Sequence, residues 1–160
     1  MFPGRTGVNI EPYTCLELSK IENIVAIKEA SGNLSQVAEI ANLCEDNLFI
    51  YSGNDNQILP ILSLGGIGVI SVLSNILPKY THDMVNYFFN GNISNSIKLQ
   101  IDFIPIIKSL FSEINPIPVK SALNLIGFDF GVPRLPLTKF SYEKELILKK
   151  ELEKIENNFL

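Results

Sequence analysis

Three short apolar runs, each followed by a helical pattern, constrain the fold of this 160-residue chain more than any other feature. The runs lie at 23–28, 48–52 and 68–72 and are rich in branched residues, which is typical of strands buried on both faces in a parallel sheet. Turn residues separate each run from a segment with apolar side chains at three- and four-residue spacing. Strands that alternate with helices through short loops predict consecutive βα units, and therefore an α/β fold.

Helical periodicity predicts most of the remaining chain. Residues 1–10 are expected to form a loop rich in Gly and Pro, and helices are expected at 11–21, 37–44, 57–64 and 78–90. Beyond residue 92 the pattern is entirely helical, with a long helix at 96–114 that carries Pro105, a shorter helix at 118–126 and a charged amphipathic helix at 141–158. We therefore divide the chain into 1–91, which holds the βα units, and a helical region at 92–160.

Composition and charge exclude several classes of protein. Hydrophobic residues make up 46% of the chain, which is enough apolar material for a sizeable core. The net charge of -4 comes from interspersed acidic and basic residues, which argues against a nucleic acid or an anionic membrane as partner. The sequence has neither a signal peptide nor an apolar run of about 18 residues, so we expect a soluble, cytoplasmic protein. Cys15 and Cys44 lie far apart in predicted helices, so neither a disulfide framework nor a zinc site is expected.

Lys28 is the most informative candidate for chemistry, because parallel βα folds place their active sites at the carboxyl ends of strands. A lysine that ends a buried strand loses hydration, which disfavours the ammonium form. The resulting neutral amine can attack a carbonyl carbon and form an imine. The structural alternative is that the side chain extends to solvent or pairs with a carboxylate such as Glu29. The strand alone leaves both interpretations open.

Two further residues, Gly53 and Arg5, are weaker candidates, and a third, His82, is not a candidate. Gly53 would let a substrate approach the backbone after the second strand, or it simply forms a turn. Arg5 could bind a substrate carboxylate through its forked guanidinium, or it is a solvated loop residue. His82 is the single histidine and lacks a second histidine for a metal site or triad, so we assign it no role.

Five sequence blocks, taken together, resemble the dihydrodipicolinate synthase family, which includes the N-acetylneuraminate lyases. Their order and spacing match over essentially the whole chain, and the first and last blocks resemble the synthase branch. The blocks are Pro-Gly-Arg-Thr-Gly-Val-Asn (3–9), Ile-Lys-Glu-Ala-Ser-Gly (27–32), Tyr-Ser-Gly-Asn-Asp (51–55), Gly-Val-Ile-Ser-Val (68–72) and Asn-Pro-Ile-Pro-Val-Lys (115–120). The resemblance implies a partial (β/α)8 TIM barrel made of its last three βα units, followed by a C-terminal helical segment.

The resemblance also implies an activity and a set of site residues. The family reaction condenses pyruvate with L-aspartate 4-semialdehyde to 4-hydroxy-tetrahydrodipicolinate, in lysine (diaminopimelate) biosynthesis. By this resemblance Lys28 forms the imine with pyruvate, and Arg5 binds the carboxylate of the semialdehyde. Gly53 and Ile70 line the pyruvate pocket. No metal or organic cofactor is implied, since the lysine itself serves as the electron sink.

Relative to the family pattern, the N-terminal half of the barrel is absent, together with its catalytic tyrosine and its Gly-Thr-Thr-Gly-Glu segment. We therefore expect a truncated or split synthase that is inactive alone. An N-terminal half-barrel fragment could complete an active enzyme, which is then expected to be a homo-oligomer. The alternatives are a non-catalytic fragment or assembly partner of an intact or split synthase, a gene remnant, and another pyruvate-dependent aldolase of the same family.

Overall fold

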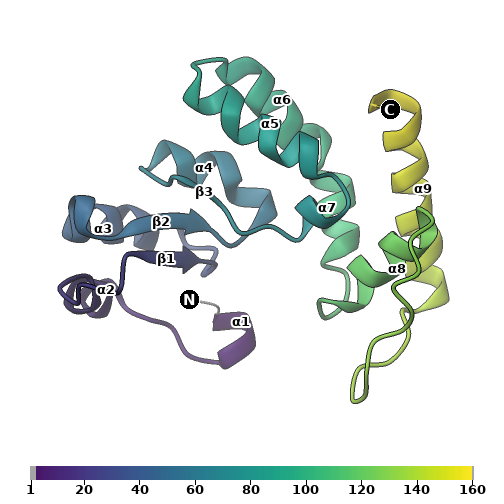
Figure 1. Ribbon diagram of the computed structural model, residues 1–160, viewed down its shortest axis with the longest axis horizontal. Coiled ribbons are helices and arrows are strands. Elements are labelled where there is room, and N and C mark those ends of the chain that lie inside the picture. The colour runs from purple at the N-terminus through teal and green to yellow at the C-terminus, as the bar shows by residue number, and fades with distance from the viewer. Residues whose placement is uncertain (1–2, 160) are drawn as a thin grey trace. The chain divides into compact units, whose positions relative to one another are not determined.

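The structure is a computed structural model that describes residues 3–159. Within these residues the strands β1 (Ala26–Glu29), β2 (Phe49–Ser52) and β3 (Gly68–Val69) form one parallel sheet in the order β1-β2-β3 (Figure 1). Helices α3 (Leu34–Cys44) and α4 (Ile58–Ser63) connect the strands. The alternation of strand and helix confirms the predicted α/β class.

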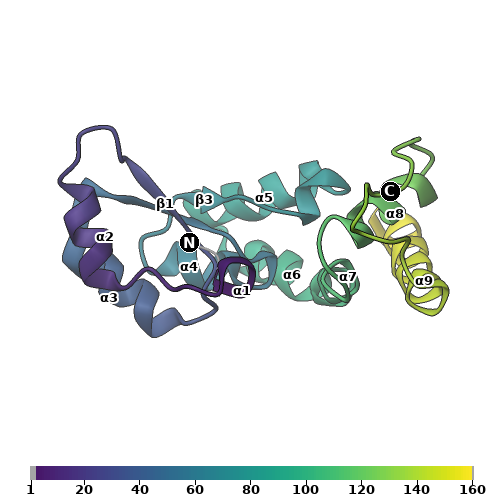
Figure 2. The same ribbon diagram turned by 90° about the horizontal axis from the view of Figure 1, so that it is seen from below.

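One face of the sheet is covered by helices. Ile27 and Ile50 point into a core shared with α3, α4 and α2 (Pro12–Ser19). The helices α2 and α3 lie side by side in both views (Figures 1 and 2). On the opposite face Phe49 is 49% exposed, and its register partner Ala26 is half-buried. The sequence predicted strands buried on both faces, whereas the described residues cover only one.

The segment predicted as an N-terminal loop instead contains a short helix, α1 (Pro3–Thr6). Pro3 sets the backbone angle that a first helical residue needs. Gly7 ends the turn at φ +70°, a conformation that glycine adopts without strain, and its N–H donates to Pro3 O at 2.9 Å. The prediction of a loop was therefore wrong for residues 3–6.

The described chain packs into two compact units that interleave along the sequence. The first comprises the residues up to Ser71 together with Asp83–Ile97, and the second comprises Val72–His82 and the residues from Lys98 onward. The helices α5 (Pro78–Phe89) and α6 (Ile93–Asp102) contribute residues to both. The division at residues 91 and 92 stays a prediction.

The second unit is helical, and one predicted helix is divided in two. Instead of a single helix at 96–114, α6 ends at Asp102 and α7 (Ile104–Leu110) begins after Phe103. Pro105 explains the break, because proline lacks an N–H and its ring collides with the preceding helical turn. At the start of α7 those defects cost nothing, since the first N–H groups of a helix have no partner within it.

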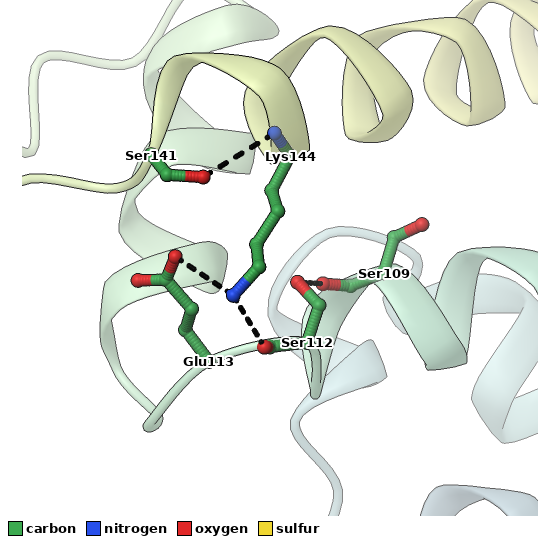
Figure 3. A network of polar contacts seen from close by, with 5 residues as sticks. All are labelled: Ser109, Ser112, Glu113, Ser141 and Lys144. Atoms are coloured by element: carbon green, nitrogen blue, oxygen red, sulfur yellow. Dashed lines mark hydrogen bonds and ion pairs between the residues drawn. The ribbon is translucent and has the colours of Figure 1, made fainter.

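The second unit is held together by packing among α7, α8 (Ile117–Leu125) and α9 (Tyr142–Phe159). Figure 3 shows how the first turn of α9 is fastened to the end of α7. Lys144 Nζ lies 3.1 Å from Glu113 Oε1 and also donates to Ser112 O at 3.1 Å. Ser141 Oγ accepts from Lys144 N at 3.4 Å, which caps α9. None of the helices within residues 3–159 is long and apolar enough to cross a membrane.

Candidate active site

Lys28 lies near the carboxyl end of β1, opposite Tyr51 of β2 in the parallel register. Its side chain is half-buried, whereas the next residue, Glu29, is fully buried. Consecutive strand residues point to opposite faces of a sheet. Glu29 therefore belongs to the face covered by helices, and Lys28 belongs to the open face.

Gly53 lies directly against the Lys28 side chain. A Cβ atom built on Gly53 would lie 2.9 Å from Lys28 Cε and 2.7 Å from Ala30 Cβ, closer than real Cβ atoms approach. Gly53 N also donates to Glu29 O at 2.7 Å, which holds the backbone in place. Gly53 is therefore more than a simple turn residue. Glycine is needed at this position because the lysine stem occupies the space that a side chain would fill.

Ile70 and Arg5 belong to other elements of the first unit. Ile70 follows β3, donates its N–H to Ser52 O at 2.8 Å and has a side chain that is 48% exposed. Arg5 is an exposed residue of α1, which lies below the tip of the β1 arrow in Figure 1. The structure thus brings Lys28 and Gly53 into contact and sets Ile70 beside β2. Arg5 is carried by a separate helix.

Glu29 is a site residue whose role sequence reasoning missed. Its Oε1 accepts from Ser31 N at 2.5 Å, and its Oε2 accepts from Gln36 Nε2 at 3.3 Å. A buried carboxylate is costly unless such bonds compensate it. The carboxylate considered as a partner for Lys28 therefore stabilises the turn after β1 and the start of α3.

The start of α3 has a signal in the sequence, because Asn33 is a residue type that caps helices. In the structure its Oδ1 accepts from Ser35 N and Gln36 N at 3.1 and 3.4 Å.

The loops after β1 and β2 are linked to each other by polar side chains. Gln57 Nε2 donates to Gly32 O at 3.1 Å, and Asn54 Nδ2 donates to Gln57 Oε1 at 3.1 Å. Ser52 Oγ donates to Asn54 O at 2.9 Å, which fixes the second loop at its base. These bonds hold the strand ends together, so the amine of Lys28 lies at an ordered edge.

The two cysteines have a structural rather than a nucleophilic environment. Cys15 and Cys44 are free, fully buried members of the core between α2, α3 and the sheet. Burial, together with the nearby Cys44 and Glu29, raises the pKa of the Cys15 thiol from 9.0 to about 11, and burial has the largest effect. Burial also raises the pKa of Cys44. Among residues 3–159, no three His, Cys, Asp or Glu side chains are grouped so that they could hold a metal ion.

Comparison with known proteins connects this geometry to one family. The model of the dihydrodipicolinate synthetase family matches residues 1–155. A 4-hydroxy-tetrahydrodipicolinate synthase from Caldicellulosiruptor saccharolyticus is 63% identical over 150 residues, which are 94% of this chain and 50% of that protein. The synthase from Acetivibrio thermocellus is 52% identical over 151 residues, with 94% and 51% covered.

Solved structures agree with the sequence comparison. Dihydrodipicolinate synthase from Aquifex aeolicus superposes with a TM-score of 0.93 at 36% identity, covering 97% of this chain and 53% of that chain. The Thermotoga maritima enzyme superposes with a TM-score of 0.92 at 39% identity, covering 95% and 53%. The chain spans about half the length of the curated relatives that it matches. Because the family model covers nearly all of the sequence, this chain belongs to the dihydrodipicolinate synthetase family.

Proposed function

We propose that this chain is the lysine-bearing half of a Schiff-base lyase that condenses pyruvate with L-aspartate 4-semialdehyde to 4-hydroxy-tetrahydrodipicolinate. The observation that carries the proposal is Lys28, which lies at the carboxyl end of a parallel strand with its stem packed on Gly53. That position is where βα folds carry out chemistry. The identity of 63% to a synthase of this name supports the choice of substrates.

The proposed chemistry uses the amine of Lys28 as the nucleophile. The Nζ lone pair attacks the keto carbon of pyruvate, and loss of water leaves a protonated imine between Lys28 and the substrate. The imine withdraws electrons, so a methyl proton can leave and the resulting enamine carbon attacks the aldehyde carbon of the semialdehyde. Ring closure through the amino group of the semialdehyde displaces Lys28 and regenerates the free amine.

Three residues of the first unit are assigned to substrate binding. Arg5 is positioned on an exposed helix and supplies a guanidinium for the carboxylate of the semialdehyde. Gly53 and Ile70 are assigned to the walls of the pyruvate pocket next to Lys28. The proton transfers are assigned to groups outside this chain, in the half-barrel described next.

The open face of the sheet supports a partner that completes a (β/α)8 barrel. Phe49 and Ile70 are 49% and 48% exposed, and a parallel sheet is stable when both faces are covered. We assign this face to an N-terminal half-barrel fragment, with the three βα units of this chain as the last three of the barrel. The completed enzyme is proposed to be a homo-oligomer that acts in the cytoplasm, in lysine biosynthesis.

Borohydride trapping tests the proposal directly. The chain is incubated with pyruvate and reduced, alone and after co-expression with the N-terminal half of the Caldicellulosiruptor saccharolyticus synthase. Mass spectrometry is expected to find one reduced pyruvate adduct on Lys28, and none in Lys28→Ala. Condensation with the semialdehyde is expected only in the co-expressed pair. An adduct on another lysine, or a pair that forms without any adduct, would contradict the proposed role of Lys28.

A further inference from the structure

A chain of hydrogen bonds joins the strand of Lys28 to the segment that follows Arg5. Its centre is a pair of side-chain amides: Asn9 Nδ2 donates to Gln36 Oε1 at 2.7 Å, and Gln36 Nε2 donates to Asn9 Oδ1 at 3.4 Å. Gln36 Nε2 is also shared with Glu29 Oε2 at 3.3 Å. Three segments that are distant in sequence are thereby connected through Asn9, Gln36 and Glu29.

The strand end of this network is rigid. Glu29 is fully buried and Gln36 is 8% exposed, so breaking their bond leaves buried polar atoms without compensation. Glu29 is fixed on three sides, since its side chain also accepts from Ser31 N and its carbonyl oxygen accepts from Gly53 N. Because Lys28 precedes Glu29 on the same strand, the carboxylate that anchors Glu29 also determines where the Lys28 backbone lies.

The Arg5 end of the network is a single folded turn. Thr6 Oγ1 donates to Val8 O at 3.0 Å and accepts from Val8 N at 3.3 Å. Asn9 continues directly from this turn and also donates to Glu11 Oε1 at 2.9 Å. Residues 6–8 of this turn are exposed, and the bond between Asn9 and Gln36 links the turn to a buried side chain.

We infer that Glu29, Gln36 and Asn9 are positioning residues. They hold the Arg5 segment, residues 3–8, at a fixed place relative to Lys28 and thereby set the affinity for the second, carboxylate-bearing substrate. This inference rests on the proposed function, in which Lys28 binds pyruvate and Arg5 binds the carboxylate of the semialdehyde. Loss of Asn9 should release the Arg5 segment and leave Lys28 in place. Loss of Glu29 should disturb both the Arg5 segment and the position of Lys28.

Trypsin provides a test that does not depend on activity, because it cleaves after Arg5. In Asn9→Ala and Gln36→Leu, cleavage after Arg5 is expected to accelerate about tenfold, since a protease needs a locally released segment. Cleavage after Lys20, an exposed residue at the end of α2, serves as the internal reference and should not change. Asn42→Ala, which alters an exposed asparagine of α3, is the matched control. Equal cleavage after Arg5 in all variants would overturn the inference.

Substrate kinetics separate positioning from a general structural role. In the co-expressed pair, Asn9→Ala is expected to raise KM for the semialdehyde about fivefold to tenfold, with kcat and KM for pyruvate changed by less than about twofold. Trapping of pyruvate on Lys28 should also stay unchanged in Asn9→Ala. In Glu29→Ala, trapping should fall about tenfold, and Glu29→Gln should recover most of it because the amide oxygen still accepts from Ser31 N.

The outcomes distinguish this inference from the proposed function. If the wild-type co-expressed pair forms but traps no pyruvate, the proposed function fails, whereas the trypsin experiment still decides whether Asn9 and Gln36 hold the Arg5 segment. If Asn9→Ala raises KM equally for both substrates, the network acts on the whole site and the positioning role is wrong. If trapping works and only KM for the semialdehyde responds, both conclusions are supported.

Discussion

At the scale of single residues, the site depends on one contact between a lysine stem and a glycine. Gly53 is not in the left-handed region, so its backbone conformation alone would accept other residues. What excludes them is the closeness of Lys28 Cε and Ala30 Cβ. A residue that is typical of a turn in the sequence therefore contributes space for the Lys28 side chain.

Gly53→Ala is expected to displace Lys28 and to lower the rate of pyruvate trapping by about tenfold or more, while destabilising the fold by about 1–3 kcal/mol. Gly4→Ala is the matched control, because a Cβ atom on Gly4 would meet no atom within 4 Å. Trapping rates follow from adduct mass against time, and stability from urea unfolding. Equal trapping in both variants would mean that the lysine stem moves aside without consequence.

The cysteines predict a pH dependence with a definite sign. The pKa of the Cys15 thiol is raised from 9.0 to about 11 in the folded chain, mainly by burial. Above about pH 9 the unfolded chain loses this proton more readily than the folded chain. The protonated Cys15 thiol therefore makes its full contribution to the free energy of unfolding below about pH 9, and this contribution is lost as the pH rises to about 11.

Urea unfolding between about pH 8 and pH 10.5 tests this expectation. Wild-type chain should lose stability more steeply with rising pH than Cys15→Ala, in which the titrating thiol is absent. Taking the difference between the two chains removes the shared titration of lysines and tyrosines. Parallel curves would show that the Cys15 thiol titrates alike in the folded and unfolded chains.

At the scale of elements, capping residues determine where helices begin. Asn33 begins α3 by accepting from Ser35 N and Gln36 N, and Ser141 does the same for Lys144 N at the start of α9. These caps satisfy N–H groups that have no partner within the helix. The start of α3 matters for the site, because its first turns carry Gln36.

Asn33→Ala is expected to lower the free energy of unfolding by about 1 kcal/mol, since two N–H groups of α3 lose their acceptor. Asn33→Asp keeps an acceptor oxygen at the same place and should stay within a few tenths of a kcal/mol of wild type, as roughly expected for equivalent caps. Urea unfolding monitored by circular dichroism measures both variants. A loss of equal size in both would indicate that the asparagine acts through contacts other than the cap.

At the scale of the whole molecule, the sheet has one covered and one open face. The open face carries Phe49 on β2, and the strands β1 and β3 each leave one edge without a neighbouring strand in the described part of the chain. Unpaired edges and exposed apolar side chains favour association with another chain. The proposed half-barrel would cover these features together.

Phe49→Lys is expected to reduce co-purification with the N-terminal half of the Caldicellulosiruptor saccharolyticus synthase by about tenfold or more, because an unpaired charge is costly to bury. The thermal stability of the isolated chain should hardly change, since Phe49 is 49% exposed. Phe128→Lys alters a similarly exposed phenylalanine, 57% exposed, in the second unit and is the control. Undiminished co-purification of the Phe49 variant would place the interface elsewhere.

Features set by local pattern could be predicted from the sequence. Apolar runs and helical spacing indicated the order of strands and helices, and Lys28 was located at a strand end because strand and turn residues are neighbours in the chain. The five sequence blocks indicated the family for the same reason, since each block is contiguous. The prediction of a single helix over 96–114 was wrong, although Pro105, the residue that breaks it, was visible in the sequence.

Contacts between distant segments required the tertiary structure. Asn9 and Gln36 are 27 residues apart, and nothing in either local pattern indicates that their amides pair. The close approach of Lys28 to Gly53, and the burial of Glu29 on the opposite face, likewise depend on how β1 and β2 lie in register. By itself the sequence determined the order of the strands and of most helices, because periodicity is local. The fold decided which side chains meet, because packing joins segments that the chain keeps apart.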